Sequence, residues 1–207
     1  MNKKMIMMAV LCAVGTAATA QLEKGKLMIG GNVGLHSYVT ENGIYGATRT
    51  NGFSISPRAG YFIKENLVIG TSISYGFNKR KGIDYDQEQS VYALNPFARY
   101  YLNITDHFKF FGEFMLSAGG GNTLTYQHWG IVNKSQNKYY SASIAPGLAF
   151  LPAKKWSIDL RFGLLDYTNQ QVKDDSPDAE NKDYVGSSQF NFGLNTIRPS
   201  IGINFHL

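Results

Sequence analysis

The sequence predicts an all-β protein: an eight-stranded, antiparallel, up-and-down transmembrane β-barrel. Three observations lead to this prediction. Segments of about ten residues alternate between apolar and polar side chains, the connections between them alternate between short and long, and the chain begins with a secretory signal. The composition agrees, because 22 glycines and 14% aromatic residues favour strands and turns over helices.

The N-terminus has the three parts of a secretory signal. Lys3-Lys4 is basic, residues 5–15 are apolar, and Ala18-Thr19-Ala20 offers the small residues that a signal peptidase recognises. The apolar stretch is shorter than the ~20 residues that cross a bilayer as a helix. We therefore expect residues 1–20 to be cleaved and residues 21–207 to form one outer-membrane barrel domain.

Charge and cysteine usage exclude several classes of protein. The formal net charge is +5, but the basic residues are scattered along the chain, so no nucleic-acid partner is expected. The single cysteine, Cys12, lies inside the expected signal, and the exported chain therefore forms no disulfide. No run of ~18 apolar residues follows the signal, so we expect no transmembrane helix.

The alternation is clearest in residues 67–78, where Leu67, Ile69 and Ile73 share one face while Ser72 and Ser74 share the other. Eight such segments can be counted, at residues 26–37, 51–63, 67–78, 89–102, 108–120, 138–151, 155–167 and 188–207. An even count suits a closed barrel whose apolar face meets lipid and whose polar face lines the lumen.

The connections predict which end of the barrel is which. Three are short, at 64–66, 103–107 and 152–154, and four are longer and polar, at 38–50, 79–88, 121–137 and 168–187. Short periplasmic turns and long external loops are typical of bacterial barrels, and aromatic residues gather near both sets of connections. In the last segment the apolar positions change parity near Asn195-Thr196, which predicts a β-bulge.

With these features the chain resembles the family of outer-membrane protein β-barrel domains, the small OmpA/OmpX-like barrels. The resemblance rests on the signal, the eight segments, and the stretches Ser56-Pro57-Arg58-Ala59-Gly60-Tyr61-Phe62 and Asn95-Pro96-Phe97-Ala98-Arg99-Tyr100-Tyr101. It implies a location in the bacterial outer membrane, contact with membrane lipids and lipopolysaccharide, and insertion by the barrel-assembly machinery. We also expect a monomer.

Six charged residues fall on the polar face of the expected strands: Arg58, Arg99, Glu113, Asp159, Arg161 and Arg198. The lumen of an eight-stranded barrel is only wide enough to be filled by side chains. Buried charges are costly unless they are paired, so we expect these residues to form a structural ion-pair network. The alternative is a path for protons or ions.

No catalytic residue is expected. In a lipid A-modifying barrel enzyme the candidates would be His36 with Ser37, or His128, but neither lies in a recognisable nucleophile motif. His107 and His206 fall at the opposite end of the barrel.

No metal or cofactor is expected either. The connection 168–187 carries carboxylates at Asp174, Asp175, Asp178, Glu180 and Asp183, but their spacing is not that of an EF-hand. We expect a solvated loop there, with binding of divalent cations as the alternative. Gly119-Gly120-Gly121 is not a phosphate loop, because no Lys-Ser or Lys-Thr follows it at the required spacing.

The predicted function is a structural, adhesion or interaction role through the external loops, toward host or envelope proteins. The alternatives are a lipid A-modifying enzyme and a narrow channel for ions or small solutes. A soluble lipocalin-like barrel is the rival fold, and it would turn the apolar face inward around a ligand.

Overall fold

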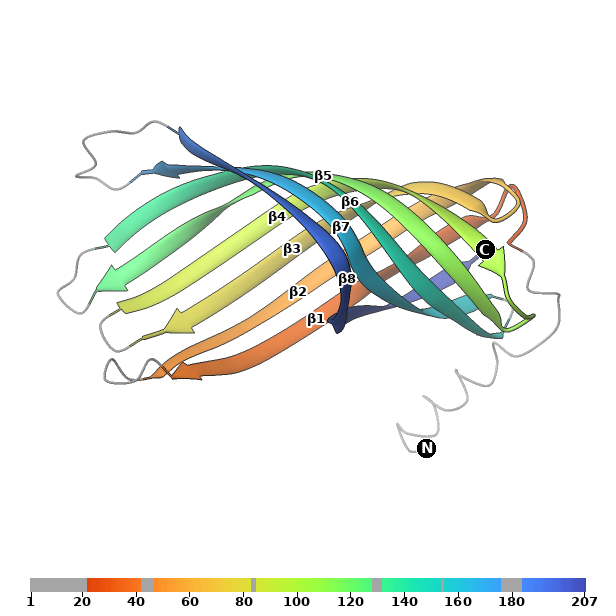
Figure 1. Ribbon diagram of the computed structural model, residues 1–207, viewed down its shortest axis with the longest axis horizontal. Helices are drawn as coiled ribbons and strands as arrows, with labels where there is room; N and C mark the ends of the chain where they lie inside the picture. The colour runs from red at the N-terminus through yellow and green to blue at the C-terminus, as the bar shows by residue number, and fades with distance from the viewer. Residues whose placement is uncertain (1–21, 42–46, 83–84, 128–131, 154, 176–183) are drawn as a thin grey trace, which may run out of the picture.

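The computed structural model describes residues 22–41, 47–82, 85–127, 132–153, 155–175 and 184–207, with the backbone alone for Val132 and residues 194–199. Eight antiparallel strands form one closed barrel in chain order (Figure 1). They are β1 (Leu27–Glu41), β2 (Ala47–Lys64), β3 (Leu67–Lys81), β4 (Tyr85–Asn103), β5 (Phe108–Gln127), β6 (Val132–Ala153), β7 (Trp156–Asp174) and β8 (Tyr184–His206). Within these ranges no helix has the length and apolar character needed to cross a bilayer.

The predicted short turns are confirmed at all three positions. β2 and β3 are joined through Glu65 and Asn66, and Asn66 adopts the left-handed conformation, with φ of 61°. Asparagine tolerates this conformation better than most residues, which suits it to a tight turn. Because short turns are typical of the periplasmic end of bacterial barrels, we assign these turns to that end.

The predicted long external loops are wrong in length, because most of their residues continue the strands. β5 runs to Gln127, and its pairing with β6 persists to Tyr126 opposite Val132. Beyond the membrane both faces of a hairpin meet water, so the apolar alternation stops while the backbone pairing continues. The sequence pattern shows where the apolar alternation stops, but it does not show where the backbone pairing stops.

The two faces of the wall are oriented as predicted for a membrane barrel. Large apolar side chains such as Ile73, Leu94 and Phe114 are exposed on the outside, whereas Arg99 and Glu113 are buried inside. A lipocalin-like barrel would have the opposite arrangement, so this rival fold is excluded.

The periplasmic end of the lumen is filled by apolar side chains. The cluster contains Leu22, Met28, Phe62, Val68, Phe97, Tyr101, Phe111, Ala149 and Leu151. Leu22 precedes β1 and reaches this cluster because its carbonyl accepts a hydrogen bond of 2.9 Å from the Asn66 amide in the β2–β3 turn. Packing of this kind closes the lumen at the level of the short turns.

The junction between β1 and β8 is short. The described pairs join Met28–Asn32 to Gly202–His206, although both strands continue well beyond these residues. β8 also slips against β7, since Phe192 to Ser200 lies opposite Arg161 to Leu165. This irregularity confirms the predicted bulge, and in Figure 1 the outer part of β8 runs away from β1.

The orientation of the wall predicts how two isoleucines respond to the same change. Ile73 is 61% exposed in the middle of β3, and Ile104 is 58% exposed in the β4–β5 turn. Ile73→Arg should lower the free energy of unfolding by about 2–4 kcal/mol, because arginine at mid-membrane loses its hydration, whereas Ile104→Arg near the interface should cost about 0–1 kcal/mol. Urea unfolding in lipid vesicles measures both, and equal costs would contradict the membrane position of β3.

Candidate functional site

The charged site lies inside the lumen and is centred on the carboxylate of Glu113. The strand register sets Glu113 on β5 directly opposite Arg99 on β4. Oε2 of Glu113 accepts hydrogen bonds from Nη2 of Arg99 at 2.7 Å and from Nη1 of Arg58 at 3.0 Å. Nε of Arg161 lies 3.1 Å from the other oxygen, Oε1. One buried carboxylate thus contacts three guanidinium groups from three other strands.

A second carboxylate extends the site toward the periplasmic end. Asp159 forms an ion pair with Nη1 of Arg99, and its Oδ2 also accepts a hydrogen bond of 2.7 Å from the side-chain amide of Asn204. The hydroxyl of Ser157 donates to its other oxygen at 2.7 Å. Arg99 therefore bridges the two carboxylates, and β4, β5, β7 and β8 are tied together across the lumen.

Aromatic rings pack against the guanidinium group of Arg99 on the side nearer the short turns. The Arg99 guanidinium carbon lies 4.0 Å from the ring centre of Phe111 and 5.6 Å from that of Tyr101, whose hydroxyl accepts a hydrogen bond of 2.9 Å. Contacts of this type attract cations to the ring face. Gly147 makes room for Phe111, since a Cβ there would lie 2.2 Å from the ring.

The electrostatic balance of the site is positive. Among the described residues three guanidinium groups meet two carboxylates, in the ion pairs of Arg58, Arg99 and Arg161 with Glu113 and of Arg99 with Asp159. The side chain of Arg161 is 20% exposed, whereas those of Arg58 and Arg99 are almost fully covered. Arg161 therefore faces the open, outer part of the lumen.

The arrangement does not form a catalytic triad, although it contains a serine, a histidine and an acid. Ser157 donates its only hydroxyl proton to Asp159, and Nε2 of His206 lies 3.2 Å from the same hydroxyl oxygen. In a hydrolytic triad the acid contacts the histidine, and the histidine accepts the serine proton. All three side chains are also buried. The geometry supports cross-linking of the wall.

The structure brings five of the six predicted lumen charges together: Arg58, Arg99, Glu113, Asp159 and Arg161. The sixth, Arg198, lies in the part of β8 whose side chains are outside the described residues. Sequence reasoning missed Tyr101, Ser157, Asn204 and His206. Their positions in the alternation give a signal, because each lies two residues from another inward-facing residue, but polar or aromatic type alone does not single them out.

Apart from His206, the described histidines considered for catalysis lie away from any serine–histidine–acid cluster. His36 faces the lumen and stacks on Tyr38 at 6.2 Å, whereas Ser37 faces outward and donates to Asn51 at 2.7 Å. His107 donates from Nδ1 to the carbonyl of Leu151 at 3.1 Å, in a periplasmic turn. His128 lies outside the described residues.

The remaining predicted features are placed as follows. Asp175 contacts Gln136 at 2.9 Å and Lys134 at 3.4 Å, while Asp178, Glu180 and Asp183 lie outside the described residues. Within the described chain no group of three or more His, Cys, Asp or Glu residues could hold a metal ion. Gly119–Gly121 is part of β5 and lies against β4, where a Cβ at Gly121 would fall 2.0 Å from the Ser90 carbonyl oxygen.

Comparison with known proteins agrees with this architecture. The sequence model of the outer membrane protein beta-barrel domain family matches residues 6–196. The chain belongs to this family. It is therefore a protein of the bacterial outer membrane, surrounded by membrane lipid and lipopolysaccharide. The search of curated protein sequences finds no match.

Solved structures share the fold at low identity. The translocator domain of the autotransporter NalP from Neisseria meningitidis is 11% identical with a TM-score of 0.53, over 91% of this chain and 64% of that one. The chain thus spans less than two thirds of the NalP domain. The attachment invasion locus protein Ail of Yersinia pestis is 18% identical with a TM-score of 0.43, over 89% of this chain and 99% of Ail. At 11% identity the similarity to the NalP domain concerns the fold alone.

The contacts of Glu113 predict a large effect of removing its charge. Glu113→Gln should lower the free energy of unfolding by about 3–5 kcal/mol, because guanidinium groups stay buried beside a neutral amide. Glu88→Gln is the matched control, since it removes the same charge from the partly exposed pair with Lys79, at 2.5 Å, and should cost about 0–1 kcal/mol. Urea unfolding in vesicles compares them. A cost for Glu113→Gln no larger than for Glu88→Gln would mean that the lumen carboxylate is hydrated.

Proposed function

We propose that this protein is a non-enzymatic, non-conducting interaction barrel of the bacterial surface, which presents a rigid extension of its wall to partners outside the cell. One observation carries the proposal: the lumen is closed by paired charges and apolar packing, while paired strands continue far past the apolar band. A closed lumen argues against the channel alternative. A function at the cell surface would explain why the paired strands continue beyond the apolar band.

The length of β6 supports an extension outside the membrane. Its outward positions are apolar from Phe150 to Tyr140 and then become Lys138, Gln136 and Lys134. A tilted strand crosses the hydrocarbon in about 9–11 residues, which is the span from Phe150 to Tyr140. The remaining residues of β6, still paired with β5 and β7, therefore project into the aqueous phase.

Polar contacts stiffen this extension. Lys79, beyond the outer aromatic residues, donates to Glu88 at 2.5 Å, and this hydrogen bond and charge raise the pKa of the ammonium group. The ring of Tyr184 lies 4.6 Å from the ammonium nitrogen of Lys138. Gln136 and then Lys134 hold the pKa of Asp175 below its usual range. A surface of ordered strands loses less entropy on binding than a loop does.

The partners follow from this position. The extension lies at the level of lipopolysaccharide sugars and of host or neighbouring envelope proteins, which are the partners we propose. The barrel is proposed to act as a monomer after insertion by the barrel-assembly machinery. The lipid A-modifying alternative is less well supported, because the described serines and histidines form no accessible nucleophile.

Shortening the β5–β6 hairpin tests the proposal. Replacing residues 122–136 by Asn-Gly keeps the pair of Gly121 with Asn137 and supplies a turn that suits two antiparallel strands. The variant should fold, because the apolar band is intact, and bacteria that display it should lose adhesion to host cells or self-association mediated by the full-length chain.

Two measurements make the outcome clear. Heat-modifiable gel migration reports whether the shortened barrel is folded, and adhesion and sedimentation assays use a non-adherent outer-membrane host carrying either form. Unchanged adhesion and self-association by the folded variant, or no effect of the full-length chain on either assay, would contradict an interaction role for the extension.

A further inference from the structure

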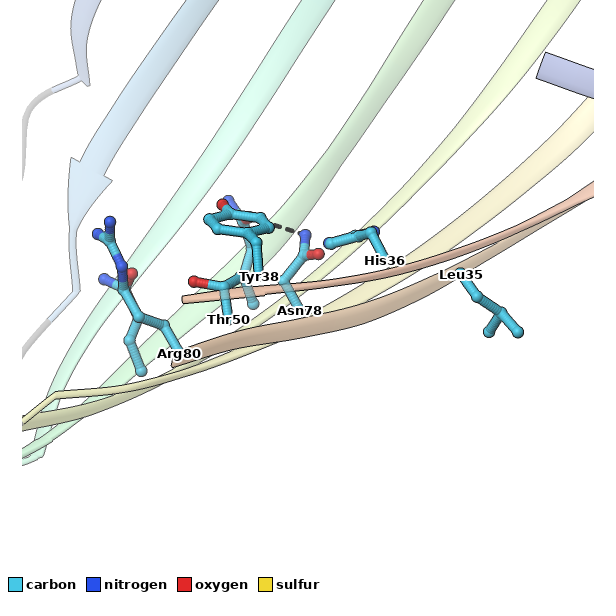
Figure 2. A pocket seen from close by; sticks show the side chains of 8 residues that line it. Leu35, His36, Tyr38, Thr50, Asn78 and Arg80 are labelled. Carbon is cyan, nitrogen blue, oxygen red and sulfur yellow. Dashed lines mark hydrogen bonds between the residues drawn. The ribbon is translucent and has the colours of Figure 1, made fainter. Parts of the chain in front are cut away.

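Above the charged network the lumen contains a polar cavity of about 670 Å³ beside β1–β4. Figure 2 shows the side chains of His36, Tyr38, Thr50, Asn78 and Arg80 on the inner side of the wall, with Leu35 pointing to the other side. Gln87 and Gln89 complete the lining, and Gln89 accepts a hydrogen bond of 3.4 Å from Asn78. A volume of this size is typical of small-molecule sites, which are about 300–1,000 Å³.

The lining is rich in donors and carries positive charge. It offers a guanidinium group, an imidazole, three amides and two hydroxyls, and contains no carboxylate among the described lining residues. The carboxylates of β4 at this height, Asp86 and Glu88, lie in register with Lys81 and Lys79. Among the described residues, Arg80 takes part in no ion pair. The cavity therefore suits an anionic, hydroxyl-bearing group.

A second, apolar groove lies on the outer surface of the same part of the wall. It has a volume of about 640 Å³ and is lined by Leu35, Phe53 and Phe77, among others. Leu35 and His36 line both the inner cavity and this outer groove. The polar and apolar sites therefore meet at one position of β1.

That position lies on a free edge of the sheet. The described pairs of β1 with β8 end at Asn32, and the Leu35 side chain is 82% exposed. Eight residues beyond Leu27, Leu35 is still within the about 9–11 residues that cross the hydrocarbon. A sheet edge exposed to lipid is unfavourable, because its backbone groups find no hydrogen-bonding partner there. A molecule that covers this edge would relieve the cost.

We propose that an amphiphile of the outer leaflet binds across the free edge of β1, its apolar chain against Leu35, Phe53 and Phe77 and its anionic, hydroxyl-bearing head on Arg80 and the amides inside the lumen. The charged network below the cavity stops the head from passing further. The head-group end of this site, at Arg80, lies next to Lys79 at the base of the extension proposed above. Binding of the amphiphile does not require the adhesive role of that extension.

Gly52 is required for the shape of the cavity. A Cβ at this position of β2 would lie 2.3 Å from Oδ1 of Asn78 and 2.4 Å from Cε1 of His36. The missing side chain lets both groups lie against the wall, where they form the floor beside Arg80. Gly52→Ala should therefore displace two polar groups of the site without changing any charge.

Native mass spectrometry of the full chain in a neutral detergent tests the site with lysophosphatidic acid, which has one apolar chain and a phosphate head. One molecule should bind per barrel. Arg80→Gln should weaken binding about tenfold, the value of a lost charged hydrogen bond, whereas Arg49→Gln should leave it unchanged. Arg49 is the matched control because it lies on the outward face, between the inward-facing Thr48 and Thr50.

Further variants and one competitor test the apolar and polar parts of the proposed site separately. Leu35→Asn and Gly52→Ala should each weaken binding, while Val185→Asn, at a position 75% exposed but outside both cavities, should not. Glycerol 3-phosphate should not compete, because it lacks the chain. Absence of binding, equal losses for Arg80→Gln and Arg49→Gln, or full competition by glycerol 3-phosphate would overturn the proposal. Heat-modifiable migration verifies that each variant is folded.

Discussion

The contact of Glu113 with three guanidinium groups is the interaction on which the rest of this structure depends. A narrow lumen buries whatever side chains face it, and each buried charge needs a partner. Glu113 meets Arg58, Arg99 and Arg161 from three other strands, and Arg99 passes the network on to Asp159. Because these contacts cross the lumen, they fix the strands relative to one another in a way that neighbouring backbone pairs alone do not.

The network also divides the barrel into two unlike halves. On the periplasmic side Phe62, Tyr101 and Phe111 pack together and leave no open path through the described lumen. On the outer side threonine, asparagine, glutamine, histidine, tyrosine and arginine side chains line an open space, and the strands extend it beyond the membrane. Function is therefore expected at the outer end, on the extension and at the edge of β1.

The fold followed from the sequence because alternation, turn residues and segment count describe a barrel without reference to any distant contact. Alternation also assigned Arg99 and Glu113 to the same face, but their pairing depends on strand register, which the sequence does not display. The lengths of the outer strands were missed because pairing between two polar faces leaves no apolar pattern, as in residues 133–138 of β6. The β1 edge was not predictable, since it arises from where β8 stops pairing with β1. The cavity beside Arg80 was not predictable either, because its lining from β1 to β4 is brought together by strand register.

The closure of the lumen is the central claim, and ion conductance tests it most directly. The full-length barrel, refolded and inserted in a planar bilayer in potassium chloride, should give no steady current above that of the bare membrane, because the network and the apolar cluster together obstruct the path. A stable, ohmic conductance that scales with the number of inserted barrels would contradict the claim and would return the channel hypothesis to first place.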